Sequence, residues 1–261
     1  MICAGIDAGS RTIKVVLLDK DTLAVVGTGV ADQGVRQSER AMRLLDEVLV
    51  AAGLRRSDLG RIVATGYGRD SIEAAHTTIT EITCHACGVR RIMPQARTVV
   101  DIGGQDSKLL RLDAQGRVHD FVMNDRCAAG TGRFLEVVAA RLEIHLNDLG
   151  PLAQQSRAPA AISSMCVLFA ETEIIGLLAA GIGAADIAAG VQSAIAARVA
   201  AMAGNRLAEP VAFTGGVALV PGMRAALEAA LGRPVSVVDA PRLTGALGAA
   251  LIGADSARSN H

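Results

Sequence analysis

The chain has 261 residues, 51% of them hydrophobic, which is enough to bury one large core or two smaller ones. Lys and Arg total 26, as do Asp and Glu, so neither a nucleic-acid surface nor a polybasic membrane surface is indicated. The sequence contains no Trp and a single Tyr, which argues against a base-stacking platform for single-stranded nucleic acid.

The sequence predicts neither a targeting segment nor a membrane span. The N-terminus lacks a basic segment leading into an apolar run, so it predicts a strand rather than a signal peptide. The most apolar stretch, residues 174–202, is interrupted by Asp186, Gln192 and Arg198. We therefore expect a soluble, cytoplasmic protein without a nucleic-acid or membrane partner, whose cysteines are thiols or ligands rather than disulfides.

The first third of the chain predicts a hairpin, a third strand, a helix and a fourth strand. Short β-branched runs bounded by Gly and Ser predict the strands, and apolar residues at helical spacing before Gly53 predict the helix. The expected strands are residues 2–7, 12–18, 23–30 and 61–64, the last leading into a turn at 65–68, and the expected helix is 38–52.

The rest of the chain repeats this pattern and then becomes Ala-rich and helical. A second hairpin and a following strand precede a Gly-rich turn and a helix, and two late strands precede a closing helix. The expected strands are residues 99–102, 107–112, 118–123, 211–214 and 235–238, and the expected helices are 133–142, most of the chain after Cys166, and 244–252.

Two hairpins share one layout, a strand ending in Asp, a Gly turn and a return strand with Lys. They occupy residues 6–14 and 100–108, which suggests an internal duplication. The sequence therefore predicts an α/β fold with two lobes, residues 1–95 and 96–243, each with a mixed five-stranded sheet and with a nucleotide cleft between the lobes. The helix at 244–256 is expected to pack back on the first lobe.

These hairpins have the parts that bind a nucleoside triphosphate. Glycine turns let backbone amides approach phosphate oxygens, and a carboxylate at a strand end can hold Mg²⁺ through waters. Asp7, Asp101 or Gln105 could orient the attacking water. One Asp-x-Gly is more often an ordinary hairpin turn, but two copies at strand ends favour the phosphate interpretation.

The late segment from Phe213 to Ala218 strengthens that interpretation. Its Gly215-Gly216 turn after a buried strand would let a base or ribose lie against bare backbone. The small-residue helix face from Gly245 to Ala250 suits either close packing between lobes or ordinary helix packing, and both remain open. The sequence has no P-loop motif. Together these segments resemble the phosphate-1, phosphate-2, adenosine and connecting motifs of the actin, Hsp70 and sugar-kinase superfamily.

Cys127 and Cys166 each stand at a predicted helix start, where partial positive charge and free N–H groups stabilise a thiolate or an anionic cluster. Spacing alone favours two small buried side chains instead. Two thiols are also half of the four that usually hold a [4Fe–4S] cluster, a shortage that a symmetric dimer would remove.

Several stretches together resemble the BadF/BadG/BcrA/BcrD-type ATPases, the activators of 2-hydroxyacyl-CoA dehydratases and the ATPase subunits of benzoyl-CoA reductases. They are residues 4–10, 64–69, 80–86 and 100–108 and the segments around Cys127 and Cys166. The resemblance implies an ATPase whose Cys127 and Cys166 bind one [4Fe–4S] cluster between two protomers. It also implies that ATP hydrolysis changes the helix angle at the cluster and passes a low-potential electron to the partner enzyme.

The resemblance further implies a homodimer, or a heterodimer with a sister subunit, and ferredoxin or flavodoxin as the electron donor. It assigns Asp7, Asp101 and Gln105 to catalysis, and Cys127 and Cys166 to the cluster. The residues expected to bind ATP or ADP with Mg²⁺ are Gly9, Ser10, Lys14, Gly103, Gly104, Ser107, Lys108, Gly130, Thr131, Gly132, Gly215, Gly216 and Val217.

The remaining cysteines are expected to be structural. Cys84 and Cys87 form a lone C-x-x-C without the second pair that a zinc site needs. The family usually has a basic residue where Cys87 stands, which is a departure. We expect Cys84 to be a buried thiol, Cys87 to be incidental, Cys3 to lie in the core and His85 to satisfy hydrogen bonds near the interlobe turn.

Two alternative functions stay open on sequence grounds. A small-molecule, sugar-type kinase of the same superfamily would need a further Asp facing an acceptor hydroxyl, and the Cys127 segment would have no use in it. A nucleotide-switch scaffold without redox chemistry would bind ATP but no iron.

Overall fold

The computed structural model describes residues 1–163, 166–204 and 206–258. Ser164 and Met165, which precede Cys166 and the helix predicted after it, lie outside the described residues.

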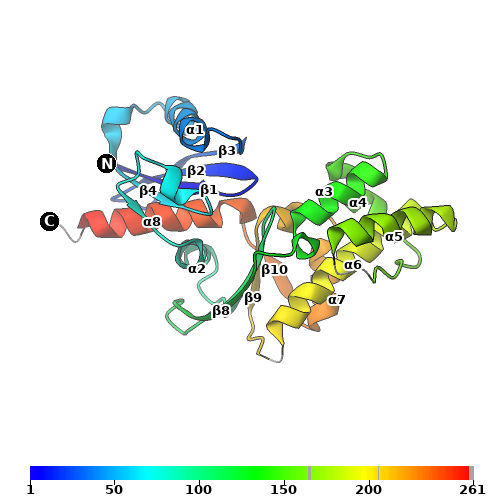
Figure 1. Ribbon diagram of the computed structural model, residues 1–261. Helices are drawn as coiled ribbons and strands as arrows, with labels where there is room; N and C mark the ends of the chain where they lie inside the picture. The colour runs from blue at the N-terminus through cyan, green and yellow to red at the C-terminus, as the bar shows by residue number, and fades with distance from the viewer. Residues whose placement is uncertain (164–165, 205, 259–261) are drawn as a thin grey trace. The chain divides into compact units, whose positions relative to one another are not determined.

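Two compact units make up the chain. The first contains residues 1–95, 112–118 and the segment from 242 onward, and the second contains residues 96–111 and 119–241. Each has a five-stranded sheet with flanking helices (Figure 1), so the predicted α/β class with two mixed five-stranded sheets is confirmed.

The sheet of the first unit is centred on β1 (Ile2–Ala8) and has the strand order β3-β2-β1-β4-β5. β1 runs antiparallel to β2 (Thr12–Asp19) and parallel to β4 (Leu59–Thr65). The outer strands are β3 (Val25–Asp32) and the two-residue β5 (Thr77–Thr78). Every residue of β1 is buried, as expected for a strand covered on both faces.

Helices cover both faces of this sheet. α1 (Gln37–Ala51) lies on one face and α8 (Thr244–Arg258) on the other, with α2 (Glu81–Ile92) packed on α8 (Figure 1). At Gly5 the backbones of β1 and α8 come so close that a Cβ would collide with the Ala246 carbonyl. The last helix of the chain is therefore part of the first unit's core.

The sheet of the second unit has the order β10-β9-β6-β7-β8. β6 (Thr98–Ile102) is its centre and runs antiparallel to β7 (Ser107–Leu112) and parallel to β9 (Val211–Thr214). The edge strands are β8 (Val118–Asn124) and β10 (Val235–Val237).

The helices of the second unit share one large core in which Phe134 and Phe213 are fully buried. α6 packs against α4 and α7, and α3 packs against α5. These helices are α3 (Gly132–Arg141), α4 (Leu146–Ala153), α5 (Val167–Ala179), α6 (Ala184–Ala203) and α7 (Met223–Leu231). The short 3-10 segments of the chain are Arg56–Asp58, Arg69–Ser71, Ala128–Gly130, Gly216–Leu219 and Pro241–Leu243.

Within the described ranges, none of the helices combines the length and the hydropathy that crossing a bilayer requires.

The structure adds α2, α4 and the two-residue β5 to the elements that the sequence patterns predict. α2 begins with a Thr80 cap, and its β-branched start gives a weak helical pattern, so packing on α8 stabilises it. β3 begins at Val25 rather than Leu23 because Leu23 has a φ of +56° in the turn, where its amide donates to the Asp19 carbonyl. The closing helix runs on to Arg258.

Candidate functional site

The first predicted phosphate hairpin joins β1 to β2 and carries an ion pair where β1 ends. Asp7 and Lys14 are cross-strand neighbours, with Lys14 Nζ 3.1 Å from Asp7 Oδ2. The Gly9 amide closes the turn by donating to the Thr12 carbonyl at 3.1 Å. A Cβ at Gly9 would lie 2.8 Å from Lys14 Nζ, so glycine leaves room for the ion pair. Ser10 lies half-buried in the same turn.

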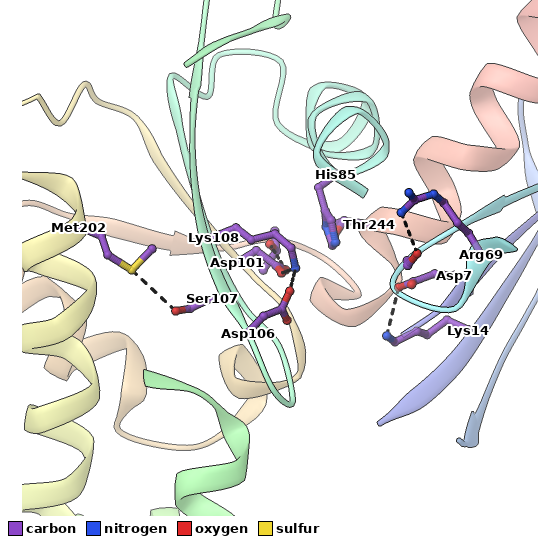
Figure 2. Close-up of polar contacts among 12 residues, drawn as sticks. Asp7, Lys14, Arg69, His85, Asp101, Asp106, Ser107, Lys108, Met202 and Thr244 are labelled. Carbon is purple, nitrogen blue, oxygen red and sulfur yellow. Dashed lines mark hydrogen bonds and ion pairs between the residues drawn. The ribbon is translucent and has the colours of Figure 1, made fainter. Parts of the chain in front are cut away.

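The turn after β4 packs against the Asp7 carboxylate. The Gly68 amide donates to the Ala8 carbonyl at 2.8 Å, and Gly66 has a φ of +90°. A Cβ at Gly66 would collide with Asp7 Oδ1, so only glycine allows this approach. Arg69 Nη1 donates to the Gly66 carbonyl at 3.3 Å and so supports the turn (Figure 2).

The second hairpin joins β6 to β7 and buries its charged groups more deeply. Lys108, whose side chain is 3% exposed, lies 3.5 Å from Asp101 Oδ2 and also pairs with Asp106 (Figure 2). The Thr214 hydroxyl donates to Asp101 Oδ1 at 2.8 Å. Buried charges need such partners because desolvation is costly. Asp101 is therefore contacted from two neighbouring strands.

Two other predicted residues of this hairpin point elsewhere. Gln105 is exposed at the tip. The buried Ser107 hydroxyl lies 3.8 Å from Met202 Sδ, on the opposite face of β7 from Lys108. The structure thus brings Lys108, but not the Ser107 hydroxyl, to the Asp101 carboxylate.

The Gly215-Gly216 turn follows β9, beside Asp101. Gly215 has a φ of +89°, and a Cβ there would collide with the Ile102 carbonyl. Gly216 is exposed, with no atom within 4 Å of an added Cβ, and so presents bare backbone. The Val217 side chain is buried in the core, so only its backbone can face a ligand.

The loop between β6 and β7, residues 103–106, is the predicted phosphate-2 loop. It is hydrogen-bonded directly to the start of α3. The Gly132 amide donates to the Gly103 carbonyl at 2.9 Å, and the Arg133 amide donates to the Gly104 carbonyl at 2.8 Å. Thr131 caps the helix by accepting from the Arg133 amide at 3.3 Å. A Cβ at Gly132 would lie 3.1 Å from the Gly103 oxygen, so glycine permits the close approach. Movement of this loop therefore acts directly on α3.

Asn124 fixes the backbone of Cys127. Its side chain donates to the Cys127 carbonyl at 2.8 Å and accepts from the Cys127 amide at 3.1 Å. Gly130, in the 3-10 segment that follows, is buried, and a Cβ there would lie 3.2 Å from Asn124 Nδ2. The thiol at 127 and the start of α3 are thus joined by a short, tightly bonded stretch.

Cys127 and Cys166 line one pocket of about 690 Å³. Cys127 is half-buried and precedes the three-residue 3-10 segment Ala128–Gly130 rather than the predicted helix start, because α3 begins only at Gly132. Cys166 is exposed and directly precedes α5, whose N-terminal end carries partial positive charge. The pocket also contains two ion pairs: Arg141 with Glu171, and Arg133 with Glu136 at 2.8 Å. A further cation, Arg126, is exposed at the same pocket.

Within residues 1–163, 166–204 and 206–258, no group of three or more His, Cys, Asp or Glu side chains is arranged to hold a metal ion. One chain therefore offers two thiols at this pocket, which is half of the usual ligand set of a [4Fe–4S] cluster.

Comparison with known proteins identifies the family of the chain. Residues 4–253 match the BadF/BadG/BcrA/BcrD ATPase family. The chain belongs to this family. The activator of lactoyl-CoA dehydratase from Anaerotignum propionicum is 43% identical over 259 residues, which cover 99% of both chains.

Solved structures of two BadF/BadG/BcrA/BcrD-type relatives agree with the fold. The activator of 2-hydroxyisocaproyl-CoA dehydratase from Clostridium difficile, with bound ADPNP, has 39% identity and a TM-score of 0.93, covering 100% of this chain and 97% of its own. Component A of (R)-2-hydroxyglutaryl-CoA dehydratase from Acidaminococcus fermentans has 40% identity and a TM-score of 0.94, covering 99% of each chain. The predicted family, its actin-like fold and its ATPase class are thereby confirmed.

In this BadF/BadG/BcrA/BcrD ATPase the other three cysteines are wholly or partly buried in the first unit. Cys3 and Cys84 are fully buried, and burial raises the pKa of Cys84 to about 12. Cys87 is half-buried between α2 and α8, and burial raises its pKa as well. Reactivity at neutral pH is therefore not expected of Cys84.

Three residues of the site were not predicted from the sequence: Thr214, Asn124 and Thr244. Thr214 could have been found from a repeated sequence pattern, because β4 and β9 both end in a Thr that is followed by Gly. Asn124 has a local signal, since Asn often bonds backbone a few residues on. Thr244, whose hydroxyl lies 2.9 Å from His85 Nδ1, has none, because the two residues are 159 positions apart.

Proposed function

We propose that this ATPase is an electron-transfer component that hydrolyses ATP to deliver low-potential electrons to a partner of the 2-hydroxyacyl-CoA dehydratase or benzoyl-CoA reductase type. The family and the activators to which the chain is 39–43% identical support this activity. The acyl-CoA chemistry belongs to the partner, and this chain supplies the energised electron.

The observation that carries the proposal is the connection between the phosphate-2 loop and α3. Gly103 and Gly104 accept hydrogen bonds from the Gly132 and Arg133 amides, and Cys127 lies just before that helix. A change in the loop between ATP-bound and ADP-bound states would shift α3 and the thiol together. Hydrogen bonds between the nucleotide-binding loop and the segment that follows Cys127 would therefore couple ATP hydrolysis to electron transfer.

Cys127 and Cys166 would hold a [4Fe–4S] cluster together with the same two residues of a second copy or of a sister subunit. Their shared pocket and the start of α5 at Cys166 fit half of such a site. When bound, the cluster supplies a one-electron redox couple. The protein orients the thiol of Cys127 through Asn124 and supplies positive charge from Arg126 and the start of α5.

The two hairpins would bind the nucleotide. We assign Asp7 to hydrated Mg²⁺, and the glycine backbone with Lys14 and Lys108 to the phosphates. Asp101 and the exposed Gln105 would orient the attacking water. Gly216, with its bare exposed backbone, would lie against the nucleoside.

Five free cysteines suit a reducing compartment, so we place this function in the cytoplasm, with ferredoxin or flavodoxin as donor. The test is iron and acid-labile sulfide analysis of anaerobically purified protein. About two irons per chain are expected, because four irons would be shared by two chains.

A Cys127→Ala variant should lose this iron, whereas Cys87→Ala should keep it, because Cys87 packs in the core of the first unit and does not line the pocket. Iron-free wild-type protein that still hydrolyses ATP, with oxygen damage excluded, would contradict the cluster and favour a kinase or a nucleotide switch.

A further inference from the structure

Gln33 is a half-buried glutamine just past the end of β3 that the proposed nucleotide chemistry has not used. Its side-chain amide donates to the Gly9 carbonyl at 2.8 Å. Its backbone amide donates to the Arg11 carbonyl at 2.9 Å. A single residue therefore holds the carbonyls on both sides of Ser10, at the tip of the turn between β1 and β2.

The orientation of the Gln33 side chain is fixed by its own hydrogen bonds. Its Oε1 accepts from the Gly34 amide at 3.1 Å, and the Gly9 carbonyl can only accept, so the nitrogen is the end that faces Gly9. The Gly9 amide in turn donates to the Thr12 carbonyl at 3.1 Å. The end of β3 is thus bonded to the carbonyl side of the turn.

The geometry of the peptide bond carries this constraint to the next amide. The bond between Gly9 and Ser10 is trans. In a trans peptide the C=O and the N–H lie in one plane and point in opposite directions. Because the Gly9 carbonyl points to the Gln33 side chain, the Ser10 N–H points away from it.

This orientation decides whether the turn attracts or repels a phosphate. A backbone N–H directed at an anion makes a hydrogen bond about twice as strong as one between neutral groups, whereas a carbonyl oxygen in its place would repel the anion. Glycine restricts the rotation of the peptide plane less than any other residue, so the plane after Gly9 needs an external contact to hold it. The Gln33 side chain is that contact.

We propose that Gln33 is a positioning residue for the nucleotide phosphates. It holds the Gly9 carbonyl and thereby directs the Ser10 N–H toward the phosphate oxygens, while it contacts only backbone and not the nucleotide. This inference rests on the proposed nucleotide site, and it adds a residue from β3 to the Asp-x-Gly hairpin.

The test compares two substitutions of Gln33 in the full-length chain. Gln33→Met removes the donor to Gly9 without adding charge, and Gln33→Glu keeps the acceptor for the Gly34 amide but has no donor. The measurements are the Kd for ADPNP with Mg²⁺, by calorimetry, and KM and kcat for ATP. Both variants should raise Kd and KM about tenfold, because a hydrogen bond to a charged group is lost. The kcat should stay within about twofold, because this bond serves bound ATP and the transition state alike.

Arg40 gives a matched control, because its Nη1 donates to the carbonyl of Asp32, the residue before Gln33, at 3.3 Å. Arg40→Met removes a contact and a cation from the same segment but leaves the bond to Gly9, so Kd should stay within about twofold. Unchanged affinity in Gln33→Met, an equal loss in Arg40→Met, or a loss in kcat instead of KM would overturn the inference alone. Wild-type protein that does not bind ADPNP would overturn the proposed function as well.

Discussion

The β1–β2 and β6–β7 hairpins have the same layout in their separate units. In the first, Asp7 on β1 is aligned with Lys14 on the antiparallel neighbour and with Thr65 on the parallel neighbour. In the second, Asp101 on β6 is aligned with Lys108 and Thr214 in the same two ways. Each threonine is followed by a left-handed glycine, with φ angles of +90° and +89°.

They differ in how the aspartate is bonded. Thr214 donates to Asp101 at 2.8 Å, but the buried Thr65 hydroxyl makes no hydrogen bond to Asp7 in the described part of the chain. Lys108 is almost fully buried, whereas Lys14 is 16% exposed. Asp101 is therefore oriented by the protein itself. Asp7 keeps more of its hydrogen-bonding capacity for a ligand.

The strongest test of this difference exchanges each aspartate for asparagine. Asp7→Asn should lower kcat for ATP by about 100-fold or more, because a charge that stabilises the transition state is lost. Asp7→Asn should also lower stability, because Asp7 is buried and paired with Lys14, but by less, because Lys14 is partly exposed. Asp101→Asn should destabilise the fold more, by about 3–5 kcal/mol, because both members of its ion pair are buried. Denaturant unfolding and steady-state ATPase assays separate the two effects, and equal destabilisation by both variants would contradict the comparison.

A second test concerns the hydrogen bonds between the β6–β7 hairpin and α3. Gly132→Ala should separate the helix from the Gly103 carbonyl at a cost of about 1–3 kcal/mol from overpacking. ATP should still be hydrolysed, but ADPNP should no longer change the alkylation rate of Cys127 in the iron-free protein. Gly183→Ala is the control, since its Cβ would approach no atom closer than 3.9 Å. A persistent nucleotide effect in Gly132→Ala would show that coupling uses another path.

The smallest effects are expected from the threonines. Thr214→Val removes the donor to Asp101 and leaves a buried carboxylate oxygen short of a partner, which should cost about 1–3 kcal/mol. Thr65→Val should be within about 0.5 kcal/mol of wild type, because the hydroxyl has no hydrogen bond to lose in the described part of the chain. Urea unfolding of both variants measures the difference, and a larger loss from Thr65→Val would reverse the comparison.

Much of this arrangement could be predicted from local sequence. Asp7 with Lys14 and Asp101 with Lys108 each lie within one hairpin, so strand alternation and a Gly turn suffice to bring them together. The long Ala-rich α6 was likewise predicted from its composition.

Other features depend on contacts between distant segments, for which a single sequence carries little signal. The hydrogen bond between Thr214 and Asp101 joins residues 113 positions apart. The local sequence predicts only that Gly132 belongs to a Gly-rich turn. The structure shows that its amide donates a hydrogen bond to the Gly103 carbonyl. α2 was missed for the same reason, because its stability comes from α8, far along the chain.

The close packing of α8 on β1 at Gly5 has a consequence for how the protein is made. The first unit needs both residues 1–95 and the segment from 242 onward, whereas the second unit is continuous apart from the 112–118 hairpin tip. During synthesis β1 must wait until residues 96–243 have been made before α8 can cover it, so the contacts between β1 and α8 form late. Folding of the second unit can therefore precede completion of the first.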